Sequence, residues 1–125
     1  MNQPVHVNAA IDDYFAMWNA DDGTARRRLV ERVWLPDAQS IDPLAAVTGW
    51  DAIDAFVTSV RQQHPTHRVE QSGAHDQHHD RLRFPWQMCD AAGTVVLTGI
   101  DCVRLAGDGR FAELVGFFDG PPPAA

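Results

Sequence analysis

The order of hydrophobic patterns along the chain predicts an α+β fold, in which three helices precede a meandering antiparallel sheet. Up to residue 65 the apolar residues recur at helical spacing, and from residue 67 onward they alternate as in half-buried strands. The chain has 125 residues, which suffices for one domain with a sizeable core. It contains no internal repeat or linker. We therefore expect a single domain over 1–125, with a core over about 6–119 and a proline-rich tail at 120–125.

The first helix is predicted from a run of apolar residues on one face. Asn8 is a good N-cap, and the spacing of i, i+3, i+4 and i+7 is met by Ile11, Tyr14, Phe15 and Trp18. The segment 19–23 has the composition of a turn and ends this helix.

Two more helices follow in the first half of the chain. The second begins near Thr24, keeps the arginines at 26–28 in solvent and ends at Pro36. A short extended segment at 38–42 comes next. The third helix follows Gly49, carries apolar residues at 53, 56, 57 and 60 on one face, and ends before residue 65.

The second half of the chain predicts a meandering antiparallel sheet. The expected strands are 67–72, 82–88, 94–105 and 111–118. Turn residues at 90–93 and 107–109 separate the last three. The glycines at 107 and 109 form a hairpin turn and not a phosphate loop, because a strand follows them and not a helix.

Composition excludes several classes of partner. The formal charge of −7 and the isoelectric point near 5.1 argue against nucleic acid or an anionic membrane surface. No 18 apolar residues run together, and the first residues lack the pattern of a secretion signal, so we expect a cytoplasmic protein without a membrane span. Cys89 and Cys102 fit no metal or redox spacing.

Three polar residues interrupt the apolar pattern. Asp101 lies in the middle of the apolar face of the strand 94–105, so its carboxyl group is either paired with a cation or protonated. Tyr14 is the only tyrosine and lies on the buried stripe of the first helix, where its hydroxyl needs a partner. Asp42 precedes Pro43, which taken alone is typical of a turn.

A histidine-rich stretch at 75–79 matches no zinc-binding pattern and falls where a hairpin bend is expected. We interpret it as a solvated loop and expect no metal and no organic cofactor. Adjacent strand residues point to opposite sides, so one of His78 or His79 can still face a cavity.

The order of the elements, with Asp108-Gly109-Arg110 and Gly116-Phe117-Phe118-Asp119 near the end, resembles the NTF2-like superfamily, which includes the SnoaL-like proteins. The similarity covers residues 6–119. It implies a cone, in which a cystatin-like curved sheet wraps against helices around an apolar pocket. It also implies a homodimer. Enzymes and non-catalytic carriers share this fold, so the fold alone does not set the function.

Three segments are similar to the ketosteroid isomerases. Residues 14–21 (YFAMWNAD) look like the helix that carries the oxyanion-hole tyrosine of that family, which falls on Tyr14. Residues 40–43 (SIDP) look like the segment of the general-base aspartate, which falls on Asp42. Residues 99–105 (GIDCVRL) look like the strand of the protonated aspartic acid, which falls on Asp101.

The resemblance implies an isomerase that moves a proton α to the carbonyl of a hydrophobic ketone. The side chains expected to line its pocket are Phe15, Trp18, Phe56, His79, Trp86 and Phe117. The chain departs from that family by about one extra helical turn between the first and second motifs.

Other activities on the same fold stay open. One alternative is a SnoaL-like cyclase, dehydratase or hydrolase, although the acid/base aspartate of the polyketide cyclases falls on Gly116, which cannot act. An arginine of a hydrolase centre has candidates in Arg83 and Arg104. The other alternative is a small-molecule-binding protein without catalysis.

Overall fold

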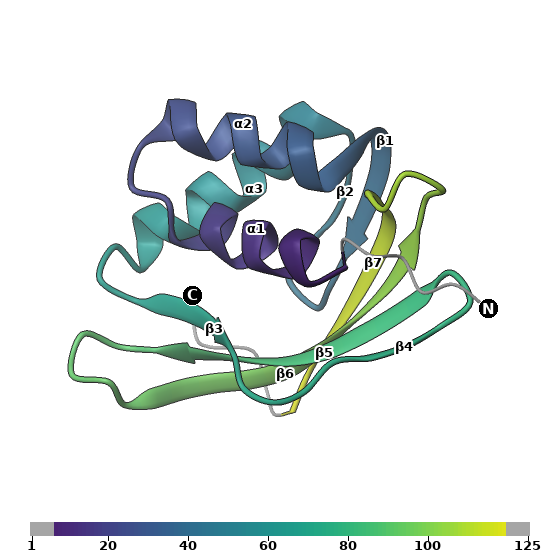
Figure 1. Ribbon diagram of the computed structural model, residues 1–125. Helices are drawn as coiled ribbons and strands as arrows, with labels where there is room; N and C mark the ends of the chain where they lie inside the picture. Colours follow the sequence, from purple (N-terminus) through teal and green to yellow (C-terminus); the bar gives the residue numbers. More distant parts are fainter. Residues whose placement is uncertain (1–6, 120–125) are drawn as a thin grey trace.

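The computed structural model describes residues 7–119, in which three helices pack against the concave face of one seven-stranded sheet (Figure 1). The elements in chain order are α1 (Val7–Asn19), α2 (Gly23–Val33), β1 (Trp34–Ile41), β2 (Ala46–Thr48), α3 (Trp50–Gln63), β3 (Arg68–Gln71), β4 (Asp76–His78), β5 (Arg81–Cys89), β6 (Val95–Leu105) and β7 (Phe111–Phe118). The strand order is β2-β1-β7-β6-β5-β3, and β4 pairs with β5. The α+β cone is thereby confirmed. Among residues 7–119, no helix is long and apolar enough to cross a bilayer.

One strand pair departs from the predicted antiparallel sheet. β1 and β7 run parallel, with Ser40 opposite Leu114 and Ile41 opposite Val115. Parallel neighbours require a crossover connection, and here α3 and the rest of the sheet provide it. The pairing places the end of β1, where Asp42 follows, beside the end of β7.

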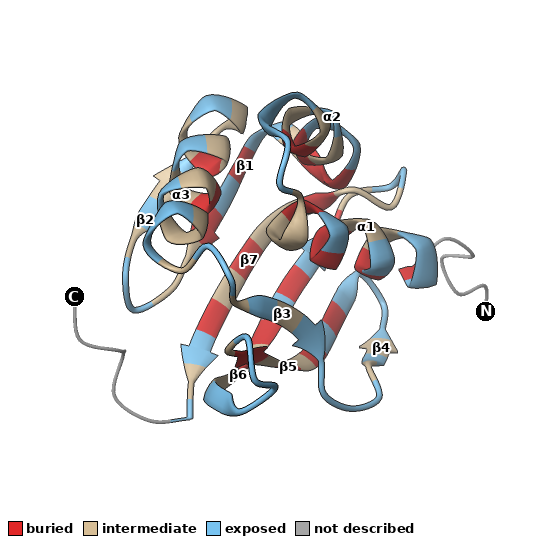
Figure 2. Cartoon of the chain, turned by 90° about the vertical axis from the view of Figure 1, so that its left-hand side faces the viewer, coloured by how far each residue is buried: buried red, intermediate tan, exposed pale blue. Residues whose placement is uncertain are grey.

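The inner face of the sheet follows the predicted alternation on β5 and β6. On β5 the even positions are buried, and on β6 the odd positions from Gly99 to Leu105 are buried, Asp101 among them. Figure 2 shows these buried stripes on the strands beneath the helices. The core between the two layers includes the fully buried Trp34, Phe84 and Phe111.

A bulge reverses the alternation on β7 and corrects one prediction. Leu105 pairs with Phe111, but Arg104 pairs with Glu113, so β7 carries one extra residue at this point. An extra residue switches every following side chain to the other face. As a result Leu114 and Gly116 point inward, and Phe117 lies on the outer face with 57% of its surface exposed.

The helix boundaries differ from the sequence prediction in three places. α1 already includes Asn8, so this residue is not the N-cap. α2 begins after Asp22, whose carboxylate accepts hydrogen bonds from the first turn. It ends at Val33 and not at Pro36, which lies inside β1. The pairing of β1 with β7 is interrupted between Trp34 and Gln39, so the missing N–H of Pro36 removes no hydrogen bond from this strand pair.

Arg26, predicted to stay in solvent, is buried. Its guanidinium donates to the Thr58 hydroxyl at 3.0 Å and to the Ala20 carbonyl at 2.6 Å. These two bonds join α2 to α3 and to the turn after α1, so the helical layer is cross-linked by a buried cation.

Candidate active site

A cavity of about 150 Å³ opens between the helices and the concave face of the sheet. Its walls are mostly apolar, and their side chains come from α1, α3, β3, β5, β6 and β7: Trp18, Phe56, Val60, Val69, Trp86, Met88, Leu97, Leu114 and Phe118. An apolar cavity of this size holds a single six-membered ring. Six polar side chains also line it, namely Tyr14, Ser40, Asp42, Gln63, His64 and Asp101. An apolar chamber with a few converging polar groups is the usual form of a small-molecule site.

Asp101 and Tyr14 meet at the inner end of this cavity. The Tyr14 hydroxyl donates to Oδ2 of Asp101 at 2.7 Å, and the Trp86 indole N–H donates to Oδ1 at 3.1 Å. Each of these side chains is at most 7% exposed. The carboxyl group of Asp101 is therefore held by one neutral donor on each oxygen, and no cation neutralises it among the described residues.

This environment favours the neutral form of Asp101. Burial raises the pKa of Asp101 from an ordinary value of 3.8 to about 7, against the opposing effect of the hydrogen bonds from Tyr14 and Trp86. Burial and the neighbouring Asp101 carboxyl group also hold the pKa of Tyr14 well above its usual range. The pair thus consists of a tyrosine hydroxyl and a carboxyl group that keeps its proton to a much higher pH than an ordinary aspartate.

Asp42 lies beyond the end of β1, half-buried, and lines the same cavity. Its Oδ1 accepts hydrogen bonds from the backbone N–H groups of Leu44 and Ala45, at 2.8 and 3.0 Å. Burial raises the pKa of Asp42, although these two bonds act against it. Among residues 7–119 no hydrogen-bond donor reaches Oδ2 of Asp42, so the turn fixes one oxygen and leaves the other as a free acceptor.

Two glycines make room for the polar cluster. A Cβ atom at Gly116 would lie 2.7 Å from Oδ1 of Asp101 and 3.4 Å from Cβ of Asp42. A Cβ atom at Gly99 would lie 2.4 Å from the Trp86 ring, so only glycine lets the indole lie across β6 and reach Asp101. Gly116 therefore lies between Asp42 and Asp101. Because it has no side chain, both aspartates can occupy their observed positions.

Of the predicted pocket residues, three line the cavity and three do not. Trp18, Phe56 and Trp86 line it. Phe15 packs edge-on against Tyr14 and Phe84 in the core beside the cavity. Phe117 is on the outer face because of the β7 bulge.

His79 also lies away from the cavity. It is exposed in the turn between β4 and β5, where its φ of 51° is the left-handed region, and its ring contacts that of His78. The histidine-rich stretch thus forms a three-residue strand and a turn. Among residues 7–119, no group of three His, Cys, Asp or Glu side chains is placed to hold a metal ion.

Sequence reasoning missed several lining residues, the most polar being Ser40, Gln63 and His64. Phe56, Val60 and Gln63 lie at i, i+4 and i+7 of α3. The spacing of the helical stripe was therefore a signal by which Gln63 could have been found. Phe118 was missed because the bulge in β7 leaves no trace in the apolar pattern.

The curved sheet, the helical layer and the enclosed acidic pocket define an NTF2-like cone. The chain matches no protein-family model. It also matches no functionally curated protein.

Solved structures place the chain in a family. A candidate isomerase of the SnoaL-like family from Agrobacterium tumefaciens is 34% identical, with a TM-score of 0.87, and the match covers 92% of this chain and 98% of that one. A candidate SnoaL-like polyketide cyclase from Jannaschia sp. CCS1 is 20% identical, with a TM-score of 0.75 and coverage of 98% and 99%. A SnoaL-like protein of unknown function from Burkholderia thailandensis is 13% identical, with a TM-score of 0.74 and coverage of 96% and 100%. The chain belongs to the SnoaL-like family. Its relatives support an enzymatic function of the SnoaL-like type.

Proposed function

We propose that the protein is a cofactor-independent isomerase of the ketosteroid isomerase type, which moves a proton α to the carbonyl group of a hydrophobic ketone. The observation that carries this proposal is the buried Tyr14–Asp101 pair, joined at 2.7 Å in an apolar cavity that Asp42 also lines. Two hydrogen-bonding acids at the inner end and one free carboxylate oxygen at the side are the parts that enolisation needs.

Asp42 is the base of the proposed reaction. Its Oδ2 takes a proton from the carbon α to the carbonyl, the C–H electron pair forms the C=C bond of an enolate, and the carbonyl oxygen becomes negative. Asp42 then returns the same proton to the γ-carbon, which regenerates the carboxylate and gives the conjugated isomer. The backbone N–H groups of Leu44 and Ala45 keep the carboxylate in place through both steps.

The Tyr14–Asp101 pair stabilises the enolate oxygen when Asp101 is neutral. The Trp86 indole N–H can only donate, so it occupies Oδ1 as an acceptor and leaves the acid proton to Oδ2, beside the Tyr14 oxygen. Asp101 then donates to Tyr14, and the Tyr14 hydrogen is free to bind the enolate. When Asp101 is ionised, Tyr14 donates to it instead, and the substrate loses this donor.

Gly116 favours this reaction over the cyclase alternative. The acid/base aspartate of the polyketide cyclases falls on this position, and a Cβ atom here would lie 2.7 Å from Oδ1 of Asp101. A side chain at 116 would displace Asp101 from its observed position, which supports Asp101 as the acid of the proposed site.

The proposal is tested by isomerisation of β,γ-unsaturated ketones, one steroidal and one small and cyclic, followed by the absorbance of the conjugated enone. We expect turnover by the native chain and a loss of at least 100-fold in Asp42→Asn, because removal of a general base costs a factor of this order. Asp12→Asn changes an exposed aspartate on α1 and is the matched control. Absence of turnover on both ketones, or equal turnover by native chain and Asp42→Asn, would overturn the proposal.

The family resemblance also implies a homodimer, and we propose the outer face of the sheet as its interface. Phe117 lies there opposite Ile100, which in turn lies opposite Pro85, so an apolar row of one exposed and two half-buried residues crosses three strands. On the same face Arg104 pairs in register with Glu113. A twofold axis that passes between the two residues would bring each of these charges against the opposite charge of a second copy.

A further inference from the structure

We propose that the cavity has a second polar subsite, formed by Gln63 and His64, and that the substrate is a single-ring ketone with a hydroxyl group on a short chain opposite its carbonyl. This inference rests on the proposed function, because it takes the Tyr14–Asp101 end as the carbonyl site. It adds the size of the substrate and the polarity of its far end.

The register of the strands gives the cavity a long axis. At the inner end, Phe84, Asp101 and Gly116 form one row across the sheet. Four residues further along β6, Leu97 forms a row with Met88 and Val69. At about 3.3 Å per residue, the two rows are about 13 Å apart. The length accommodates one ring and a chain of two or three atoms, while the width suits a single ring.

The two ends of this axis are both polar, and the middle is apolar. Gln63, the last residue of α3, and His64, its C-cap, line the cavity, and Gln63 is exposed whereas His64 is half-buried. The His64 ring lies against that of His67, with 4.9 Å between the centroids. Nδ1 of His67 is buried, and among residues 7–119 it has no hydrogen-bond partner. His67 itself does not line the cavity, so the hydrogen-bonding groups that a ligand can reach at this end are those of Gln63 and His64.

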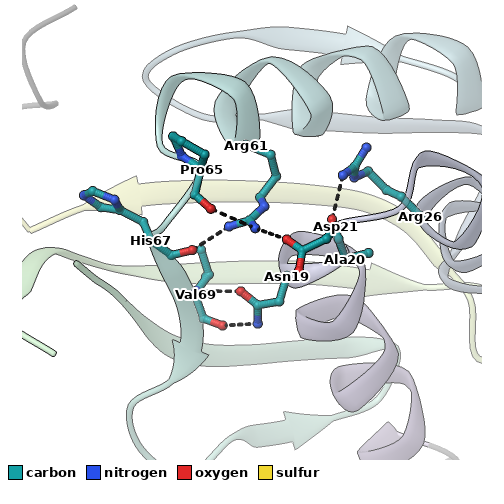
Figure 3. A network of polar contacts seen from close by, with 8 residues as sticks. All are labelled: Asn19, Ala20, Asp21, Arg26, Arg61, Pro65, His67 and Val69. Atoms are coloured by element: carbon teal, nitrogen blue, oxygen red, sulfur yellow. Dashed lines mark hydrogen bonds and ion pairs between the residues drawn. The ribbon is translucent and has the colours of Figure 1, made fainter. Parts of the chain in front are cut away.

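A rigid frame holds the far end in place (Figure 3). The Asn19 side chain at the end of α1 donates to the Val69 carbonyl at 2.8 Å and accepts from the Val69 N–H at 2.9 Å. Arg61 of α3 donates to the backbone carbonyls of His67 and Pro65 and to the Asp21 carboxylate. Figure 3 shows the His67 ring turned away from this network. The ends of both helices and the start of β3 are thus joined, and a ligand would meet a preformed site.

The charges around the cavity select a neutral polar group over an anion. Asp42 and Asp101 both line the cavity, and the chain carries a net charge of −7. Arg61, the nearest cation of the frame, is already paired with Asp21 at 2.6 Å. A carboxylate at the far end would therefore meet repulsion without a free arginine in this frame, whereas a hydroxyl group can donate to and accept from an amide and an imidazole.

The test measures binding of phenols by isothermal titration calorimetry, because a phenol oxygen resembles the enolate oxygen. The key pair is 4-(2-hydroxyethyl)phenol and 4-propylphenol, which differ by a hydroxyl group in place of a methyl group. We expect Gln63→Leu/His64→Leu to shift the ratio of the two dissociation constants five- to tenfold toward the propyl compound, a change typical of one or two lost hydrogen bonds. Gln62→Leu, at a neighbouring position that does not line the cavity, should leave the ratio unchanged.

Further arms separate this inference from the proposed function. The single variants Gln63→Leu and His64→Leu report each residue if the double variant does not fold. Binding of 4-cyanophenol, a more acidic phenol, tests the Tyr14–Asp101 end, since an oxyanion site binds acidic phenols more tightly. If the acidity effect is present and the double variant leaves the ratio within twofold, the second subsite is refuted alone. If the ratio of dissociation constants shifts but the acidity of the phenol has no effect on binding, the Tyr14–Asp101 pair is not an oxyanion site and the proposed function is refuted. A four-ring steroidal phenol that binds more tightly than the single-ring phenols would refute the size assignment.

Discussion

The Tyr14 hydroxyl lies 2.7 Å from Oδ2 of Asp101, although 87 positions separate the two residues in the sequence. The contact brings the middle of α1 onto the middle of β6, so it forms only when the helical layer closes over the sheet. Both side chains are buried, and the carboxyl group has no cationic partner among residues 7–119. From this pairing of two buried acids we expect both the proposed activity and the stability to depend on pH.

The first prediction concerns the pH dependence of isomerisation. Burial raises the pKa of Asp101 to about 7, and the proposed oxyanion donor exists only while this group is protonated. We expect kcat/KM to fall as pH rises through about 7. It should also fall in acid, where Asp42 becomes protonated. This acid limb should lie at a pH above the ordinary pKa of aspartate, because burial raises the pKa of Asp42. The rate of enone formation, measured from pH 4 to 9, checks this.

In Asp101→Asn the alkaline limb should disappear, because the amide donates at every pH. A profile with the same alkaline limb in Asp101→Asn and in the native chain would assign that limb to another group. Asp12→Asn serves again as the control carboxylate and should keep both limbs.

The second prediction concerns stability. In the unfolded chain Asp101 loses its proton near pH 4, whereas the folded chain retains it up to about pH 7. The folded state binds more protons between these values, so the free energy of unfolding should fall as pH rises from about 4 to 7 and level off above that. The total loss is roughly 4 kcal/mol, at about 1.4 kcal/mol for each pH unit.

Urea unfolding at several pH values measures this slope. Asp101→Asn cannot ionise, and the difference between the two proteins should grow with pH up to about 7 in favour of the variant. Asp42 titrates in both proteins, so its contribution largely cancels in the difference. A constant difference across this range would mean that Asp101 has no raised pKa in the folded chain.

Local patterns in the sequence predicted much of the fold. The alternation in β5 and β6 placed Trp86 and Asp101 on the inner face, and the structure has both there. The apolar stripe of α1 likewise predicted the burial of Tyr14. These predictions succeeded because each depends on one element and its own period.

Features that arise from neighbouring elements escaped this reasoning. The extra residue in β7 appears only as a shift in its register with β6, and it moved Phe117 to the outer face. The parallel pairing of β1 with β7 depends on the whole crossover. Arg26 is buried because α3 and the end of α1 supply Thr58 and a carbonyl acceptor, neither of which is near it in the pattern of α2.

The third prediction concerns Gly116, which separates the two carboxyl groups. A Cβ atom there would lie 2.7 Å from Oδ1 of Asp101, so Gly116→Ala should displace this side chain. We expect a loss of about 1–3 kcal/mol in the free energy of unfolding and weaker binding of acidic phenols. Gly107→Ala is the matched control, because a Cβ atom at this glycine meets nothing within 4 Å. Unfolding in urea and calorimetric titration measure the two effects, and a Gly116→Ala protein that matches Gly107→Ala in both would show that the space is not required.

The fourth prediction concerns association through the outer face. Phe117 is 57% exposed and forms an apolar row with Ile100 and Pro85, which a second copy would cover. Phe117→Asp places a charge at one end of that row, and burying an unpaired carboxylate costs more than an apolar contact gains. We expect the native chain to sediment as a dimer and Phe117→Asp as a monomer in analytical ultracentrifugation. Val96→Asp, at a comparably exposed valine near the β5–β6 turn, should leave the dimer intact. A monomeric native chain would contradict the proposed dimer. A Phe117→Asp protein that remains dimeric would exclude the outer face as the interface, because a buried interface at this position could not accommodate the charge.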